Sequence, residues 1–267
     1  MHNRRVFPLN ILDLGASFRR YFEVVPALST ELREHAFRIR HEVYCEELKF
    51  EPERPDRREV DDYDAQSLHL LMRSITTGEY VGCTRLVLCR GDDPYQRLPF
   101  ERTCAATLDR SIVDPQRLPR QKIGEVSRLA VISRYRMRKG ERKSPAPIST
   151  ESFGAKLGSK FMPRFPYIPV GLYLATTELA QMRGIERLFV LTEPRLAAHF
   201  SRLGVHVQQV GGPVEHRGTR VPSMLDVNEI LANLNFIMRP LHKVIAEEVR
   251  RAPTEPEPDT GRSRLAA

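Results

Sequence analysis

Hydrophobic and polar positions alternate along the chain in short periodic stretches. A helical period begins at Ser29, where Ser29 or Thr30 can cap the first turn, and continues to Val43. Two runs with strand character follow at Ser67–Ser74 and Tyr80–Cys89. The turn-forming pair Thr77-Gly78 lies between them, so this part of the chain is predicted to be an antiparallel hairpin.

The second half of the chain contains both helical periods and runs with strand character. Regular elements are predicted, in order, at Glu125–Ile132 (strand), Gly171–Arg183 (helix), Arg187–Thr192 (strand), Pro194–Leu203 (helix), Val205–Val210 and Met224–Val227 (strands), and Val227–Glu248 (helix). No internal repeat is present. The pattern predicts a mixed α/β domain built around one sheet.

Three boundaries follow from changes in composition. Residues 1–28 are weakly patterned and are interpreted as an N-terminal extension. Residues 29–250 form the predicted single domain, and a basic insertion interrupts it at 133–168. Residues 251–267 have the polar, proline-rich composition of disorder.

Composition places the chain among globular proteins. Of 267 residues, 41% are hydrophobic, which is enough for a sizeable core. No apolar run reaches the roughly 18 residues that span a bilayer, and the start lacks the pattern of a secretion signal, so we expect a cytoplasmic protein. The four cysteines have neither paired nor metal-ligand spacing and are interpreted as small buried hydrophobes: Cys45, Cys83, Cys89 and Cys104.

The net charge of +8 is concentrated in one segment. Residues 133–165 contain nine basic and two acidic residues, so this stretch carries +7. A basic segment of this kind can be a solvated loop, or it can be a docking surface for an anionic partner such as nucleic acid, a membrane or an acidic carrier protein.

Three segments of the first half carry candidate chemistry. They are Arg40-His-Glu-Val-Tyr44 with Phe50 beyond it, Val60-Asp-Asp-Tyr-Asp64, and Glu125-Val-Ser-Arg128 preceded by Arg85. Their order and spacing resemble LuxI-type autoinducer synthases and the long-chain N-acyl amino acid synthases. They are also similar to the acyltransferase group associated with exosortase and PEP-CTERM sorting systems. The resemblance spans about residues 37–210.

The resemblance implies a fold and a set of site residues. The fold is that of the N-acetyltransferase (GNAT) superfamily, with a mixed, mostly antiparallel central sheet flanked by helices. Glu125 is the implied catalytic carboxylate, with Ser127 and Arg128 beside it. The residues implied to bind substrate or shape its pocket are Arg40, Tyr44, Phe50, Asp61, Asp64 and Arg85. Autoinducer synthases typically carry Phe and Trp at the two aromatic positions, whereas this chain has no tryptophan, which argues against recognition of S-adenosylmethionine.

Elementary chemistry supports a carboxylate at this place. Attack on a thioester needs a neutral amine, and a partly desolvated carboxylate can take its proton. Glu125 can do this, or it can be an ion-pair partner of Arg128 or Arg85. Arg85 could also hold a substrate carboxylate in bidentate fashion, and a backbone N–H near Leu129 or Val131 could stabilise the oxyanion. The other charged residues can equally be a structural network at the surface.

The donor is inferred from what the chain lacks. The Q/R-x-x-G-x-G/A loop that binds the acyl-CoA pyrophosphate in this superfamily is broken, since only Arg136-Met-Arg-Lys-Gly140 remains of it. We therefore expect an acyl-phosphopantetheine thioester as co-substrate, on acyl carrier protein or on CoA, with no tightly bound cofactor and no metal. The predicted carrier-docking residues are Arg136, Arg138, Lys139, Arg142 and Lys143.

The predicted function is transfer of a fatty acyl group from such a thioester to the amine of an amino acid or a similar small amine. Peripheral membrane contact could aid release of a lipid product. The alternatives are an acyl-homoserine lactone synthase, a nucleic-acid-binding protein and a non-catalytic acyl-binding protein. Nucleic acid is not expected as a partner, because few aromatic residues interleave with the basic ones and no helix-turn-helix or zinc motif is present.

Overall fold

The structure is a computed structural model that describes residues 13–90, 93, 95–136, 166–193 and 205–252. Its helices are α1 (Leu14–Tyr21), α2 (Thr30–Arg40), α3 (Pro99–Thr103), α5 (Tyr167–Met182), α7 (Val227–Asn233) and α8 (Met238–Arg251). Its strands are β1 (Phe22–Pro26), β2 (Ser67–Ser74), β3 (Tyr80–Leu88), β4 (Ile123–Val131), β5 (Arg187–Thr192), β6 (Gln208–Gln209), β7 (Val214–Glu215) and β8 (Thr219–Asp226). None of the described helices is long and apolar enough to cross a membrane.

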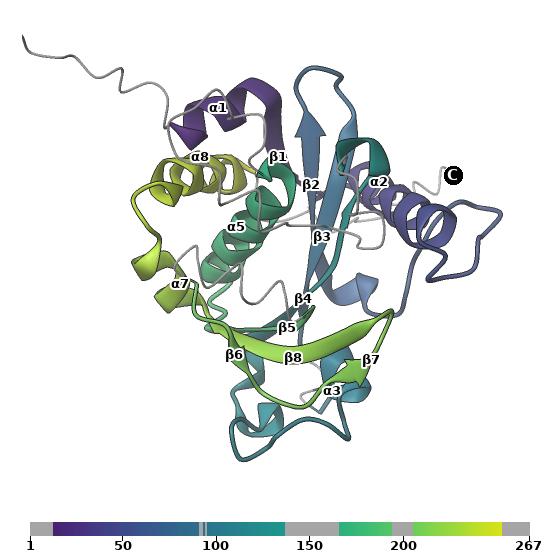
Figure 1. The fold of residues 1–267 in the computed structure, drawn as a ribbon, viewed down its shortest axis with the longest axis vertical. Coiled ribbons are helices and arrows are strands. Elements are labelled where there is room, and N and C mark those ends of the chain that lie inside the picture. The colour runs from purple at the N-terminus through teal and green to yellow at the C-terminus, as the bar shows by residue number, and fades with distance from the viewer. Residues whose placement is uncertain (1–12, 91–92, 94, 137–165, 194–204, 253–267) are drawn as a thin grey trace, which may run out of the picture.

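One sheet organises the described part of the chain (Figure 1). The strand order is β1-β2-β3-β4-β5-β8-β6, and β7 pairs with β8. Every pairing is antiparallel except that of β4 with β5. The predicted mixed, mostly antiparallel sheet flanked by helices is confirmed, and the hairpin of β2 with β3 lies where the sequence predicts it.

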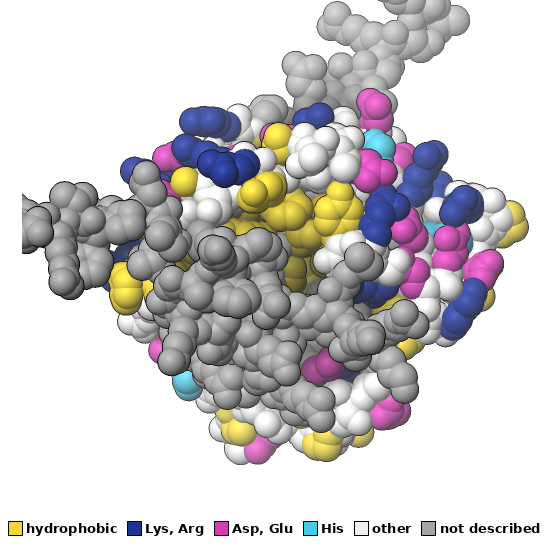
Figure 2. Space-filling model, turned by 45° about the horizontal axis from the view of Figure 1, so that its top comes forward, with side chains coloured by type: hydrophobic (Ala, Val, Ile, Leu, Met, Phe, Trp, Pro, Cys, Tyr) yellow, Lys and Arg dark blue, Asp and Glu magenta, His cyan; other side chains and the backbone are white. Residues whose placement is uncertain are grey.

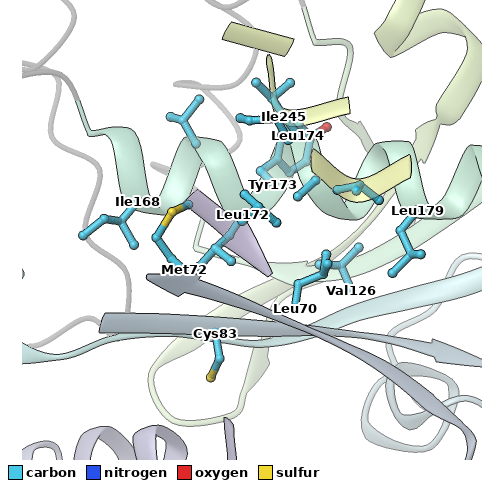
Figure 3. Packing of buried hydrophobic residues seen from close by; sticks show 14 of the residues in the cluster. Leu70, Met72, Cys83, Val126, Ile168, Leu172, Tyr173, Leu174, Leu179 and Ile245 are labelled. Carbon is cyan, nitrogen blue, oxygen red and sulfur yellow. The ribbon is translucent and has the colours of Figure 1, made fainter. Parts of the chain in front are cut away.

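Helices cover the two faces of the sheet unequally. α5 packs on β1 to β4, and α8 and α1 complete that layer, while α2 packs on the opposite face of β2, β3 and β4 (Figure 1). Figure 3 shows Leu70 and Met72 of β2 facing Leu172 of α5, with Cys83 of β3 directed away from them. The Cys83 thiol instead lies 3.7 Å from the carbonyl oxygen of Ala36 in α2.

The central helix α5 differs from a surface helix. Most of its sixteen residues are buried, because it lies between the sheet and α8. It begins at Tyr167, four residues before the predicted start. A Cβ on Gly82 of β3 would lie 2.9 Å from the Ile168 side chain, so a glycine at this position permits the close approach of α5 to the sheet.

The N-terminal boundary needs correction. Residues 1–28 were predicted to be an extension outside the domain, but within that range α1 and β1 are part of it. β1 pairs with β2 from Phe22 to Pro26, and Phe18 of α1 is fully buried against the core. The amphipathic pattern of α1 is only two turns long, which is too short to stand out in sequence.

Other boundaries also differ. The predicted last helix is two helices, α7 and α8, separated near Leu234. The predicted strand at Val205–Val210 is reduced to β6, whereas the strand at Met224–Val227 starts earlier, at Thr219. The predicted helix Pro194–Leu203, residues 137–165 of the insertion and residues 253–267 of the tail lie outside the described residues.

Candidate active site

The sheet opens between β4 and β5. The two strands pair only from Ile123 with Arg187 to Val126 with Val190. β4 continues to Val131 along β3, and β5 continues along β8. In the described part of the chain, the second half of β4 therefore has no strand beside it on the β5 side, so the backbone groups on that edge can face a ligand.

A bulge lies at the start of this open segment. On β3 the step from Cys83 to Arg85 covers two residues, but on β4 it spans the three from Ala130 back to Ser127. Arg128 has a φ of 56°, the left-handed conformation that non-glycine residues rarely adopt. Such bulges bend a strand and redirect a side chain. Here the guanidinium of Arg128 is directed to the carboxylates of Glu59 and Asp61.

These contacts belong to a cluster of six charged residues, which we call the charge network. Its cations are Arg40 of α2, Arg85 of β3 and Arg128 of β4, and its anions are Glu59, Asp61 and Asp64 of the segment before β2. Three positive and three negative charges balance each other, which makes burial of the cluster tolerable.

Asp64 is the centre of the charge network. Its two oxygens accept hydrogen bonds from Arg40 Nη1 and Nη2 at 2.6 and 3.0 Å, and Oδ1 also accepts one from Arg85 Nη1 at 2.6 Å. Burial opposes ionisation of Asp64, but the hydrogen bonds and charge of Arg40, together with Arg85, hold its pKa well below the usual range. Asp64 therefore stays ionised and fixes both arginine residues.

The carboxylate that Arg85 holds in bidentate fashion is that of Asp61. Nη1 and Nη2 of Arg85 lie 2.6 and 2.8 Å from the two Asp61 oxygens. Arg40 and Arg85 are each 1% exposed. Neither guanidinium is available to a substrate in this arrangement, because both are paired with the carboxylates of the charge network. The accessible members of the charge network are Asp61 and Arg128, whose side chains are 27% and 14% exposed.

Glu125 lies on the same face of the sheet, next to the charge network. It stands opposite Val87 of β3 and Phe189 of β5, so its neighbours in the sheet are apolar. Oε2 accepts one hydrogen bond, from the backbone N–H of Phe100 in α3, at 2.7 Å. Burial raises the pKa of Glu125 to about 8, and that hydrogen bond and the nearby Arg85 offset only part of the effect. A carboxylate with a raised pKa is a stronger base.

Ser127 is engaged by the charge network. Its hydroxyl oxygen accepts a hydrogen bond from Nε of Arg85 at 3.0 Å. The predicted catalytic group lies in the middle of β4, at Glu125, Ser127 and Arg128. Glu125 is the member whose titration falls near neutral pH.

The two predicted aromatic residues lie together beside the bulge. Tyr44 belongs to a π-helical segment, His41–Glu47, that continues α2. Its ring stacks on Phe50 with centroids 6.5 Å apart, and its hydroxyl donates to the carbonyl oxygen of Leu129 at 3.0 Å. π-helical turns are rare and frequently mark functional sites. Here the turn carries Tyr44 to the open part of β4.

Several residues of this region were not predicted from sequence. Glu59 completes the charge network. It directly precedes the Val60–Asp64 motif, so the sequence could have indicated it. Arg217, in the turn between β7 and β8, reaches the Tyr44 ring although it is remote in sequence, and its neighbour His216 contacts its guanidinium. Phe100 binds Glu125 through its backbone N–H, which a sequence pattern does not reveal.

The predicted docking residues divide into two groups. Arg136 is buried and forms an ion pair with Glu47, so the prediction that it docks a carrier does not fit its position. Arg138, Lys139, Arg142 and Lys143 lie outside the described residues.

On the face seen in Figure 2, hydrophobic side chains gather in a hollow, with basic and acidic side chains beside it.

Comparison with known proteins agrees with the fold. The sequence profile of the acetyltransferase (GNAT) domain matches residues 39–143. A search of curated protein sequences found no match.

Similar solved structures include three synthases. The acyl-homoserine lactone (AHL) synthase LasI is 17% identical with a TM-score of 0.53, covering 80% of this chain and 96% of its own. The CoA-dependent acyl-homoserine lactone synthase BjaI, with SAM and isopentyl-CoA, is 19% identical with a TM-score of 0.50, covering 87% and 90%. FeeM, an N-acyl amino acid synthase from uncultured soil microbes, is 14% identical with a TM-score of 0.50, covering 82% and 97%. At these identities the likeness concerns the fold.

The matched segment begins at the end of α2 and contains the charge network, the hairpin of β2 with β3, and β4 with Glu125. This part of the chain is thus similar to the acetyltransferase (GNAT) domain, and the fold is similar to those of acyl-homoserine lactone synthases and an N-acyl amino acid synthase.

Proposed function

We propose that the protein is an N-acyltransferase that moves a fatty acyl group from a phosphopantetheine thioester to the amine of an amino acid or a similar small amine. The observation that carries this proposal is Glu125, a buried carboxyl with a pKa of about 8 beside the open end of β4. The GNAT domain match and the synthase folds support the reaction class.

The reaction assigns a role to each part of the site. The amine nitrogen attacks the thioester carbon, and its proton passes to Glu125, directly or through a water. The C–S bond then breaks, and the departing thiolate takes up a proton. The open backbone of β4 near Leu129 and Val131 is proposed to donate to the oxyanion. Asp61 and Arg128, the accessible members of the charge network, border the acceptor.

Product analysis tests this function. The purified protein is supplied with acyl-CoA and acyl-carrier-protein donors and a pool of amines, and N-acyl products are measured by mass spectrometry. Glu125→Gln is expected to abolish most of the product. Glu248→Gln is the matched control, because Glu248 also accepts one backbone hydrogen bond, from Val24 N–H at 2.8 Å, and burial raises its pKa to about 7. Absence of any N-acyl product from the unaltered protein with both donors would refute the proposal.

An acyl carrier protein is the proposed donor. The support is the broken pyrophosphate loop and the +7 segment at 133–165. Charge reversal at Arg138, Lys139 and Arg142 is expected to lower the carrier-dependent rate and its salt sensitivity, while the rate with acyl-CoA stays the same. An unchanged carrier-dependent rate would show that the segment does not dock the carrier. Association with exosortase systems remains a prediction from the sequence resemblance.

Lactone synthesis is the second candidate, because two of the similar folds belong to acyl-homoserine lactone synthases. The ring pair that would face the methionine-derived substrate is here Tyr44 and Phe50 rather than a pair that includes tryptophan. Inclusion of S-adenosylmethionine in the amine pool distinguishes the two, since a lactone product would appear only with that substrate.

A further inference from the structure

The turn between β7 and β8 brings a basic residue to the candidate site. Arg217 has a φ of 55° and Gly218 a φ of 93°, so two successive residues of the turn are left-handed. A non-glycine residue held in this conformation costs free energy and is a reason to look for a role. The turn directs the Arg217 side chain onto Tyr44 and Glu51, which lie far away in sequence.

Two guanidinium groups lie against the same aromatic ring. Arg128 is 5.9 Å and Arg217 is 5.8 Å from the centroid of Tyr44. Because Tyr44 is bound to the Leu129 carbonyl, its ring is fixed relative to the open end of β4. Arg217 is thereby held at the border of the proposed acceptor site.

The two arginine residues differ in how much of their charge is compensated. Arg128 is shared by the carboxylates of Glu59 and Asp61. Arg217 forms an ion pair with Glu51, and the two side chains are 20% and 30% exposed. A guanidinium has five N–H donors in a planar fork, and a single carboxylate uses only part of them. Arg217 can therefore accept a second anionic group at its exposed edge.

The neighbour of Arg217 in the turn adds no competing charge. Nε2 of His216 lies 3.3 Å from Nη1 of Arg217. Burial, together with Arg128 and Arg220, lowers the pKa of His216. The imidazole is therefore neutral at neutral pH and can accept a hydrogen bond from Arg217, which orients the guanidinium without neutralising it.

We propose that Arg217 binds the carboxylate of the acceptor, so that the acceptor is an α-amino acid rather than a simple amine. This inference rests on the proposed acyl transfer and assigns its substrate class. Arg217 acts as a specificity-determining residue, while its ion pair with Glu51 holds it in place beside Tyr44.

Direct binding tests the inference without requiring turnover. Saturation-transfer NMR measures the binding of a mixture of the L-amino acids, and of the same amino acids as methyl esters, to the full chain without donor. Arg217→Gln is expected to weaken binding of the free acids by at least about tenfold and to leave that of the esters unchanged. Arg217→Lys keeps the charge but loses the planar fork, so an intermediate loss is expected.

Two further variants separate binding from structure. Glu51→Gln removes the ion pair but keeps the guanidinium, and it should retain binding of the free acids. Arg187→Gln removes a charge paired with Asp226 elsewhere on the sheet and should behave as the unaltered protein. Thermal melting identifies variants that do not fold.

The outcomes separate this inference from the proposed function. The inference would be overturned if no free amino acid bound the unaltered protein. It would also be overturned if the free acids bound Arg217→Gln as well as they bind the unaltered protein, or if this variant lost binding of acids and esters equally. Loss of acyl-CoA binding in Arg217→Gln, with amino acid binding intact, would overturn it in favour of a donor site. Arg217-dependent binding without N-acyl product would preserve the inference and refute the transferase.

Discussion

The backbone N–H of Phe100 and Oε2 of Glu125 form a 2.7 Å hydrogen bond that joins α3 to β4. Phe100 also stacks on Phe189, with ring centroids 4.4 Å apart, so an aromatic wall adjoins the carboxyl. One hydrogen bond from a backbone amide offsets only a small part of the hydration that a carboxylate loses on burial. This balance explains why the carboxyl of Glu125 titrates near neutral pH.

The rate of acyl transfer should depend on pH through Glu125. We expect the rate to rise as the carboxyl loses its proton near pH 8, the value to which burial raises its pKa. Glu125→Gln should lower kcat/KM by roughly 10²- to 10⁴-fold, the usual contribution of a general base. Initial rates measured from pH 6 to 9.5 check both expectations, and an unchanged pH profile in Glu125→Gln would assign the base to another group.

Stability should depend on pH in the opposite sense. The folded state keeps Glu125 protonated up to about pH 8, whereas the unfolded chain releases the proton near pH 4.5. The unaltered protein should therefore lose stability between these values relative to Glu125→Gln, in which the amide oxygen can still accept from Phe100. Thermal melts at pH 5 and pH 8.5 measure this. A Tm difference between the two proteins that does not change with pH would contradict it.

The charge network should respond differently at its buried and its accessible carboxylates. Asp64→Ala leaves Arg40 and Arg85 without their shared partner, and we expect a loss of about 3–5 kcal/mol in the free energy of unfolding. Asp61→Ala should cost less stability, because the Asp61 side chain is 27% exposed, yet it should reduce activity strongly. Urea titrations alongside rate measurements separate the two effects, and equal destabilisation would contradict the assignment.

The same carboxylates predict sensitivity to acid. The arginine residues outweigh burial and hold the pKa values of Glu59, Asp61 and Asp64 below the usual range. Their contribution to stability is present above the unfolded values of roughly 4 and is lost as pH falls through the folded values. Melts between pH 5 and pH 2.5 should show this loss. Asp61→Asn should have a shallower decline than the unaltered protein.

Tyr44 should be needed for the position of the bulge. Tyr44→Phe removes the hydroxyl that binds the Leu129 carbonyl at 3.0 Å, at a cost of about 0.5–1.5 kcal/mol of stability. The ring, its stacking on Phe50 and the two nearby guanidinium groups remain. We therefore expect kcat to fall several-fold while the KM for the acceptor changes little. A larger effect on KM than on kcat would place the hydroxyl in contact with the acceptor.

Local sequence patterns determined much of the fold. Ser29 or Thr30 was predicted to cap the helix that begins there, and it is the Ser29 hydroxyl that accepts from Leu32 N–H at 3.1 Å. The strands Ser67–Ser74 and Arg187–Thr192 have the predicted limits. These features depend on neighbours along the chain, which is why periodicity and capping are sufficient to find them.

The sequence could not show which residues of the site are buried. Arg40, Asp64 and Arg85 were predicted to face a substrate or to lie in a network at the surface, but they bind one another in the interior. A motif identifies charged residues without showing which of them form ion pairs with one another. That depends on how α2, β3 and the segment before β2 pack.

The sequence by itself determined the mixed α/β class, the order of most elements and the candidate carboxylate Glu125. Only the tertiary structure decided three further features: the separation of β4 from β5 after Val126, the left-handed bulge at Arg128, and the arrival of Arg217 at Tyr44. The physical reason is the range of the interactions. Helix caps and hairpins are set by adjacent residues, whereas the raised pKa of Glu125 and the reach of Arg217 arise where segments distant in sequence exclude water together.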